Sequence, residues 1–226
     1  MSLIEQIIEP LVSGDHLTWE EFIRRWEAMP EVKLAELIGG IVYMPSPITA
    51  GHGDMAGQLA GWLQVYAANT PVCRSGGETT WHMRNDAPQP DAHLRILEEF
   101  GGKAQLKGQY FHGAPELIVE VSLTTTSYDL FEKKSLYQSA GVDEYVVMLL
   151  PLREVRWSRL EGGVYRPVSA SPEGVLRSSV FPGLWLNVPA LVEGRMKEVL
   201  ETLQHGLDSA EHEQFLERIS KGPSEN

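Results

Sequence analysis

The feature that most constrains the fold of this chain is a short apolar strand that carries a carboxylate in its middle. The run Glu116–Val121 reads ELIVEV and places Glu120 among apolar neighbours. A nearly uniform apolar strand is typical of a sheet covered on both faces. A buried carboxylate is costly unless a cation, a proton or a hydrogen-bond donor compensates it. We interpret Glu120 as a functional residue; the alternative is an edge-strand glutamate that faces water.

A helix and a second apolar strand follow this strand. The pattern of residues Ser127–Ala140 predicts the helix, and Glu144–Leu150 (EYVVMLL) predicts another buried strand. Strand, helix and strand in this order favour a right-handed crossover between parallel strands. The chain is therefore expected to form an α/β domain with a mixed sheet.

Three polar residues share one face of the predicted helix, because Asp129, Lys133 and Tyr137 are spaced i, i+4, i+8. The simpler interpretation is a solvated salt bridge between Asp129 and Lys133. The helix directly follows the Glu120 strand, however, so this face is also placed to lie over the strand end. Lys133 would then reach a phosphate or a nucleophilic water.

A second acid, Asp91, occupies a similar strand-like setting in QPDAHLRI. Pro-Asp alone is a common turn or cap, so the weight of Asp91 comes from its pairing with Glu120. Two carboxylates that converge from neighbouring strands repel each other unless a cation lies between them. Mg²⁺ prefers oxygen ligands and keeps several waters, so two carboxylates and a backbone carbonyl suffice. The carbonyl of Val121 is a plausible third protein ligand.

Two further residues are candidates for supporting roles. Glu36 interrupts an apolar strand in LAELIGG, and it would ligate a metal through water or hold Lys133; the alternative is a strand-start glutamate on an exposed face. His52 opens a helix, where a cap or packing role competes with contact to substrate or phosphate.

The rest of the chain supplies ordinary elements around this centre. We predict a capped helix after Thr18, a hairpin around Gly39-Gly40 and a helix over residues 49–69. Further predictions are two or three strands over 71–96, a polar insertion over 98–112, hairpins over 153–188, and two amphipathic helices over 189–219 broken near Gly206.

Charge and composition limit the classes of function. The formal net charge of -12 counts against indiscriminate nucleic-acid binding, although it permits a local basic cleft. The single cysteine, Cys73, excludes an internal disulfide and a cysteine-rich zinc site. No stretch approaches the roughly 20 apolar residues of a membrane span, and the acidic N-terminus lacks the basic start of a secretory signal. We expect a cytoplasmic protein without a membrane association.

Several segments together resemble the Uma-type putative endonucleases, a branch of the PD-(D/E)XK nuclease superfamily. These segments occur in consistent order from about Leu17 to Val188: AELIGGIVYMPSP with the following HG, QPDAHL, GAPELIVEV, YDLFEKKSLYQSAGVDEYVV and FPGLWLNV. The resemblance implies a restriction-endonuclease-like fold, in which helices flank a central mixed sheet. It also implies metal-dependent hydrolysis of phosphodiesters, with Mg²⁺ or Mn²⁺ as cofactor and DNA as substrate.

The resemblance carries roles onto particular residues of this chain. Asp91 matches the PD acid, Glu120 the second acid and Lys133 the helix lysine, while Glu36, His52, Asp129 and Tyr137 fall on recurrent family positions. Two departures stand out. Ser122 occupies the position of the superfamily's usual lysine, and the loop after Val121 reads Ser-Leu-Thr-Thr without the family's proline.

Other assignments complete the expectation. We divide the chain into a nuclease-like domain with an N-terminal helical arm (1–188) and a C-terminal helical extension with a disordered tail (189–226). We expect a homo-oligomer, most simply a dimer, with the last helices as a candidate oligomerisation or partner surface. A catalytically inactive nuclease-fold module that binds protein or nucleic acid is the rival interpretation. A carboxylate-pair glycosidase ranks lower, because a sugar cleft usually has several exposed aromatic residues and the Trp residues here mostly occur at helical core spacing or in the late hairpins.

Overall fold

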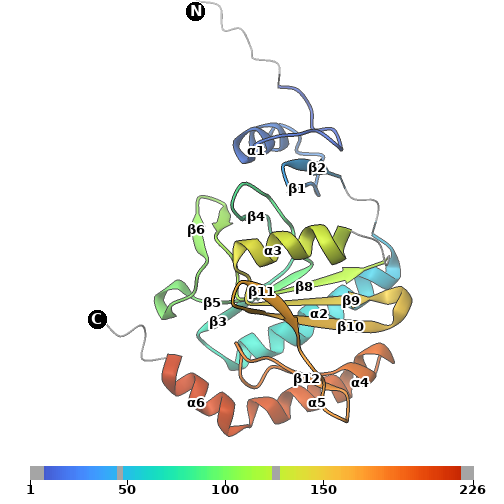
Figure 1. Ribbon diagram of the computed structural model, residues 1–226, viewed down its shortest axis with the longest axis vertical. Helices are drawn as coiled ribbons and strands as arrows, with labels where there is room; N and C mark the ends of the chain where they lie inside the picture. The colour runs from blue at the N-terminus through green and yellow to red at the C-terminus, as the bar shows by residue number, and fades with distance from the viewer. Residues whose placement is uncertain (1–7, 45–47, 124–127, 220–226) are drawn as a thin grey trace, which may run out of the picture.

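The computed structural model describes residues 8–44, 48–123 and 128–219, without the side chains of 128–130 (Figure 1). The start of the predicted arm and the predicted disordered tail lie outside the described residues. None of the helices in the described part of the chain combines the length and the apolar character that a membrane span requires.

The centre of the molecule is a mixed six-stranded sheet with the strand order β11-β10-β9-β8-β5-β3. Only the pair β8–β9 is parallel, and the neighbouring pairs are antiparallel. The predicted α/β class with a mixed sheet flanked by helices is confirmed. The strands are β3 (Cys73–Gly76), β5 (Ala92–Ile96), β8 (Leu117–Ser122), β9 (Glu144–Leu149), β10 (Glu154–Glu161) and β11 (Val164–Pro167).

Helices cover both faces of this sheet, as Figure 1 shows. The helix α3 (Lys134–Ala140) packs on one face, where it is preceded by a π-helical segment, η2 (Tyr128–Lys133). The long helix α2 (Ala50–Asn69) packs on the other face. The expected regular helix over 127–140 is therefore α-helical only in its second half. The alternation of β8 assigns its side chains to the two faces: Ile118 belongs to the α3 side, and Val119 belongs to the α2 side.

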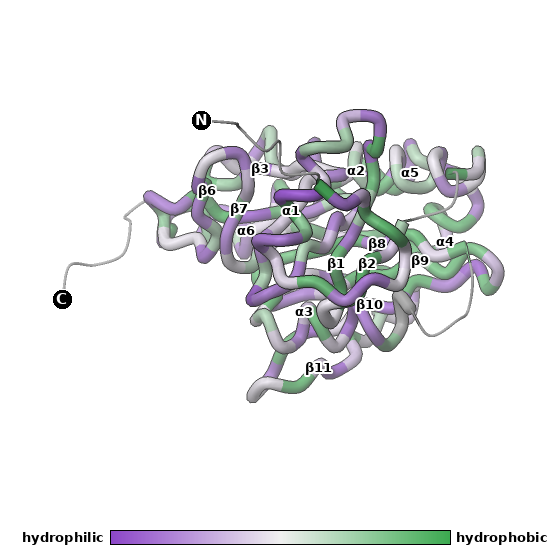
Figure 2. Tube along the Cα trace, turned by 90° about the horizontal axis from the view of Figure 1, so that it is seen from above, coloured by the Kyte–Doolittle hydropathy of each residue, from purple (hydrophilic) through white to green (hydrophobic). Residues whose placement is uncertain are grey.

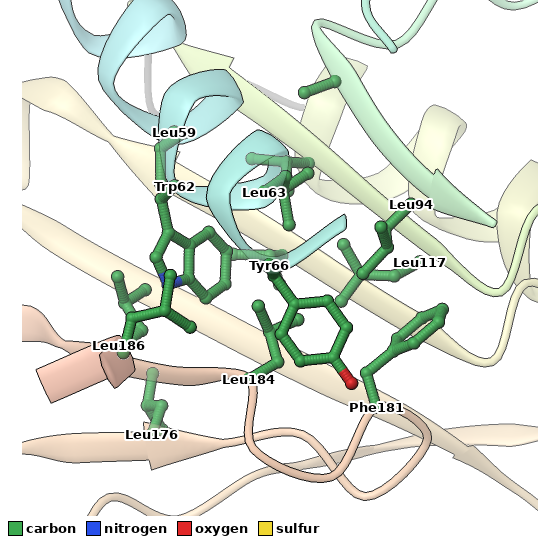
Figure 3. Close-up of a cluster of buried hydrophobic side chains, with 14 of the residues drawn as sticks. Leu59, Trp62, Leu63, Tyr66, Leu94, Leu117, Leu176, Phe181, Leu184 and Leu186 are labelled. Carbon is green, nitrogen blue, oxygen red and sulfur yellow. The ribbon is translucent and has the colours of Figure 1, made fainter. Parts of the chain in front are cut away.

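The larger core lies between α2 and the second half of the chain (Figure 3). Trp62 and Tyr66 of α2 are fully buried, and each also donates a hydrogen bond to a backbone carbonyl, that of Trp185 and that of Pro182. Their apolar neighbours come from the central sheet and from the segment 176–186: Leu94, Leu117, Leu176, Phe181, Leu184 and Leu186. Every residue of β8 and β9 is buried, and both strands lie in the middle of the molecule in Figure 2.

The C-terminal region forms three helices, so the prediction of two was wrong. They are α4 (Val188–Val192), α5 (Met196–Leu207) and α6 (Ala210–Ile219). The predicted break near Gly206 is confirmed, because α5 ends at Leu207 and α6 begins at Ala210. A Cβ at Gly206 would collide with the carbonyl oxygen of Gly183, so the glycine permits close packing there. Side chains of α5 and α6 join the same core as α2.

Smaller sheets complete the fold. The predicted polar insertion over 98–112 contains regular structure: β6 and β7 form a hairpin, and β7 pairs with β4 in parallel. The predicted hairpin at Gly39-Gly40 is present as β1 and β2. The remaining elements are α1 (Trp19–Glu27), β1 (Glu36–Ile38), β2 (Ile41–Tyr43), β4 (Trp81–His82), η1 (Glu98–Phe100), β6 (Gln105–Lys107), β7 (Tyr110–His112), η3 (Leu150–Leu152), β12 (Val175–Arg177) and β13 (Trp185–Asn187).

Candidate functional site

A buried lysine joins two glutamates that come from distant parts of the chain. The Nζ atom of Lys133 lies 3.0 Å from Oε1 of Glu120 and 3.0 Å from Oε1 of Glu36. All three side chains are buried. The positions of the strands explain this meeting: β8 lies inside the sheet between β5 and β9, so Glu120 is not an edge residue facing water. Burial likewise excludes the exposed-face interpretation of Glu36.

Tyr137 completes the cluster from the helix α3. Its hydroxyl donates a hydrogen bond of 2.6 Å to Oε1 of Glu120, the oxygen that also receives Lys133. Burial, reinforced by the nearby Glu120 and Glu36 carboxylates, raises the pKa of Tyr137 well above its usual range. The phenol is therefore a neutral hydrogen-bond donor at physiological pH.

Glu36 connects this cluster to the segment that leads into β5. Its Oε1 atom accepts a hydrogen bond of 2.7 Å from the backbone amide of Gln89, two residues before Asp91. A charge-assisted bond of this kind is stronger than a neutral one. Glu36 thereby ties Lys133 to the start of the strand that carries Asp91.

Asp91 lies at a bend immediately before β5 and not within a strand. Its Oδ2 atom accepts a hydrogen bond of 2.7 Å from the backbone amide of Val121 and lies 3.4 Å from Nε2 of His52. The carboxylate of Asp91 thus lies next to Val121, the residue that follows Glu120 on β8. The side chain of His52 comes from the first turn of α2, whose N-cap is Thr49.

A pocket of about 390 Å³ opens at the pair formed by His52 and Asp91. Glu78 also lines it, and the other walls are mainly the small residues of α2, namely Gly53, Ala56, Gly57 and Ala60. Glu78 was not identified from the sequence. It adopts a left-handed conformation, with φ 49°, which is unusual for a residue other than glycine, and its amide donates to the carbonyl of Pro90.

Two further positions discussed from the sequence are Asp129 and Ser122. The side chain of Asp129 lies outside the described residues, as do residues 124–127. Ser122, at the position of the superfamily's usual lysine, is buried at the end of β8. The ammonium group that lies next to Glu120 therefore comes from Lys133 and not from the position of Ser122.

The chemistry of these donors fits a hard divalent cation. Asp91 and Glu120 offer carboxylate oxygens, and the carbonyl of Val121 follows directly on the strand. Among the residues that the structure describes, no three histidine, cysteine or acidic side chains lie close enough to enclose a metal ion. Oxygen ligands of this kind, completed by waters, are those that Mg²⁺ takes in proteins.

Comparisons with known proteins agree with this description. A family model described as Uma2, putative restriction endonuclease, matches residues 19–189. A crystal structure of a putative nuclease belonging to DUF820 from Anabaena variabilis ATCC 29413 is similar with a TM-score of 0.61 at 13% sequence identity, over 78% of this chain and 98% of that chain. No protein with a curated description matches the sequence. The family match spans most of the chain and includes the whole cluster around Lys133, so this chain belongs to the Uma2 family, whose model is described as a putative restriction endonuclease.

Proposed function

We propose that this protein hydrolyses phosphodiester bonds in DNA with the help of a divalent cation. The observation that carries this proposal is the buried ion pair of Lys133 with Glu120. The next residue on the strand, Val121, donates its backbone amide to the carboxylate of Asp91. An ammonium and two carboxylates at one strand end are groups that metal-assisted phosphodiester hydrolysis uses to stabilise charge and to hold the ion. The family and the fold support a nuclease-like function.

Asp91 and Glu120 would hold Mg²⁺ or Mn²⁺ together with the carbonyl of Val121. When bound, such an ion neutralises charge on the phosphate and lowers the pKa of a coordinated water. The two carboxylates differ in their surroundings: Glu120 is buried, whereas Asp91 lines the pocket. Because only Asp91 of the two lines the pocket, we expect the substrate to approach the ion from the side of Asp91.

Lys133 would orient the attacking water or stabilise the charge that develops on the phosphate. A lysine used in this way must be held in place, and the two bonds of 3.0 Å to Glu36 and Glu120 provide this restraint. Glu36 and Tyr137 are positioning residues in this scheme, because they act through Lys133 and Glu120.

His52 and Asp129 have supporting roles in the proposal. His52 lines the pocket at Asp91, where its imidazole would contact a phosphate of the substrate. Asp129 precedes Lys133 by one turn of the π-helical segment. Its role as a partner of Lys133 or of a water stays a prediction.

The test is cleavage of supercoiled plasmid and of a labelled single-stranded oligonucleotide with Mg²⁺ or Mn²⁺. We expect wild-type protein to cleave, and Asp91→Ala, Glu120→Gln and Lys133→Ala to lose the activity. Lys134→Ala, purified in parallel, is the matched control, because it removes the adjacent lysine and leaves the cluster intact. Equal activity in wild type and all four variants would indicate a contaminating nuclease and reject the proposal.

A non-catalytic binding module is the second candidate, and the charge favours it. The net charge is -12, and the titratable residues among those described around the pocket are Asp91, Glu78 and His52, with no lysine or arginine among them. Nucleic acids are usually bound through such basic residues. Calorimetry with Mn²⁺ separates the two candidates: a nuclease centre binds the ion in a manner that Glu120→Gln abolishes, and a binding module of this fold has no such requirement.

A further inference from the structure

We propose that His82 and His112 form a binding site for a divalent transition-metal ion of the Ni²⁺ or Cu²⁺ kind. The two histidines lie on the small sheet β4-β7-β6, whereas Lys133 and Glu120 belong to η2 and to the central sheet. Binding at this pair is independent of the proposed hydrolysis, which uses neither histidine.

The backbone brings the two imidazoles together from strands that pair in parallel. His82 and His112 are direct partners in the register of β4 and β7, and the amide of Gly113 donates to the carbonyl of His82 at 3.1 Å. The preceding pair, Trp81 and Phe111, is stacked with 4.8 Å between the ring centroids, and Trp81 is fully buried. The two histidines therefore occupy fixed positions whether or not an ion is bound.

The two ring nitrogens have the separation that one metal ion requires. Nδ1 of His82 and Nδ1 of His112 lie 2.9 Å apart. Two imidazole nitrogens that are bound at a right angle, each about 2.0–2.1 Å from one ion, lie about 2.9 Å from each other. Square-planar and tetragonal Cu²⁺ and Ni²⁺ use such right angles, whereas the wider angle of tetrahedral Zn²⁺ would move the nitrogens apart.

The rings meet at an angle and not end to end. Their centroids are 4.6 Å apart, which is less than the separation of the two nitrogens plus two ring radii, and their planes form an angle of 73°. Two ligands of one ion form a bent pair of this kind. When no ion is bound, one Nδ1 donates a hydrogen bond to the other. An ion replaces this bond once each ring carries its proton on Nε2, so binding needs a change of tautomer and no loss of a proton.

Packing and protonation keep both imidazoles ready for a cation. Trp19 of α1 stacks on the ring of His82, with 4.0 Å between the centroids and 6° between the planes. Burial, with the neighbouring His112, lowers the pKa of His82, and burial with the nearby Lys107 lowers the pKa of His112. Both rings are therefore neutral at physiological pH, the form in which imidazole binds a metal. Of the charges near His82, Glu20 favours a cation and Lys107 disfavours it, so the imidazoles supply the affinity.

Water would complete the coordination of the ion. Within residues 8–44, 48–123 and 128–219, no three histidine, cysteine or acidic side chains are grouped closely enough to hold a metal together. Two imidazoles nevertheless select among ions, because their affinity rises from Mn²⁺ to Ni²⁺ and Cu²⁺, and Mg²⁺ prefers oxygen ligands. Since Trp19 stacks on His82, an ion at this pair would also fasten α1 to the small sheet.

The experiment titrates the full chain, without a polyhistidine tag, with Ni²⁺ in a calorimeter. Excess Mg²⁺ is present throughout, so that carboxylate sites are occupied and the heat reports on imidazole ligands. We expect wild-type protein to bind one equivalent of Ni²⁺ and to melt at a higher temperature when Ni²⁺ is added, because the ion binds the folded chain. His112→Asn should weaken binding by at least about tenfold, since even an outer partner of a metal ligand contributes that much.

His205→Asn is the matched control, because His205 is an exposed histidine on α5 and its loss should leave the Ni²⁺ affinity unchanged. Asparagine at position 112 can still form a hydrogen bond with His82, so a variant that melts as wild type does and loses Ni²⁺ separates metal binding from packing. Electron paramagnetic resonance of wild-type protein with one equivalent of Cu²⁺ gives a second measurement that needs no variant, and it should show two nitrogen ligands.

Three results would overturn the proposal of a metal site: no Ni²⁺ binding by wild-type protein, equal affinity in folded His112→Asn, or a Cu²⁺ spectrum with fewer than two nitrogen ligands. The second result would mean that the ion binds other surface groups. None of these results affects the proposed nuclease activity, which is measured by DNA cleavage with Mg²⁺ or Mn²⁺.

Discussion

The ammonium of Lys133 lies 3.0 Å from a carboxylate oxygen of Glu120, and both side chains are buried. This contact joins the π-helical segment η2 to the central strand β8, which are separated along the chain by residues 123–127. In water such a pair contributes little to stability. In this interior each charge depends on the other, because an unpaired buried charge is expensive.

Lys133→Met is therefore expected to destabilise the fold strongly. The substitution keeps the apolar stem and removes the ammonium, which leaves the carboxylates of Glu36 and Glu120 close together without their cation. Loss of one partner of a buried ion pair costs about 3–5 kcal/mol. Urea denaturation of wild type and variant measures the difference in the free energy of unfolding.

Two further variants test whether the loss of stability comes from the buried ion pair of Lys133. Lys134→Met changes the adjacent lysine, so its free energy of unfolding should stay within about 1 kcal/mol of wild type. The double variant Lys133→Met with Glu36→Gln has one fewer buried carboxylate without its cation. It should therefore recover part of the lost free energy of unfolding. If Lys133→Met alone were as stable as the Lys134 variant, the pair would contribute nothing to folding.

Asp91→Asn should separate cation binding from stability. The amide oxygen of asparagine can still accept the bond from Val121, so the free energy of unfolding should fall by about 1 kcal/mol or less. Loss of the negative charge should remove Mn²⁺ binding in calorimetry. Asp54→Asn, an exposed acid on the same α2 helix as His52, is the control that should bind Mn²⁺ as wild type does. Retained binding in Asp91→Asn would show that Asp91 is not a ligand.

The glycine beside the pocket provides a steric test of the Asp91 position. A Cβ at Gly77 would lie 2.6 Å from the backbone oxygen of Asp91, so Gly77→Ala must displace one of the two segments. We expect this variant to weaken Mn²⁺ binding and to lower the melting temperature. Gly61→Ala has the opposite expectation: no atom lies within 4 Å of its Cβ, and an alanine inside α2 should stabilise the protein by about 0.5–1 kcal/mol. Equal effects of both substitutions on binding would contradict the close packing at Asp91.

The parts of the fold that were predictable from the sequence are those with strong local patterns. The uniform apolar run of β8 and the following helix and strand indicated a buried parallel pair, and β8 and β9 are parallel and buried. The positions of Glu36 and Glu120 within apolar strands likewise indicated a buried centre. Glu36 does contact Lys133, one of the two alternatives that its position allowed.

Other features had no local signal. The π-helical start of the helix changes the spacing that i, i+4, i+8 assumed, and propensity does not distinguish it from an α-helix. Glu78 lines the pocket from a backbone in the left-handed conformation, which no glutamate pattern predicts. The pairing of β4 with β7 joins segments nearly 30 residues apart, and such non-local contacts depend on the packed fold. The division at residue 188, the dimer and the identity of the cation stay predictions.

A buried glutamate outside the site, Glu144, allows a prediction about pH. It is fully buried at the start of β9, and its carboxylate accepts bonds from Ser178 and from Ser179. Burial raises the pKa of Glu144, and these hydrogen bonds offset the rise only in part. As the pH increases past about 4.5, the unfolded chain releases this proton before the folded chain does. The free energy of unfolding should therefore fall over this range, until the folded-state pKa is also passed.

Glu144→Gln should remove this contribution, because an amide does not titrate. Urea denaturation at about pH 4 and about pH 7 gives the free energy of unfolding of wild type and variant. The wild-type value minus that of the variant should decrease from the lower to the higher pH, by about 1.4 kcal/mol for each unit by which the folded-state pKa is raised. Glu211→Gln on the exposed face of α6 controls for a general effect of charge, and its difference from wild type should not decrease in this way. A difference for Glu144→Gln that is constant or grows with pH would mean that the interior stabilises the ionised carboxylate, so that the hydrogen bonds from Ser178 and Ser179 outweigh burial.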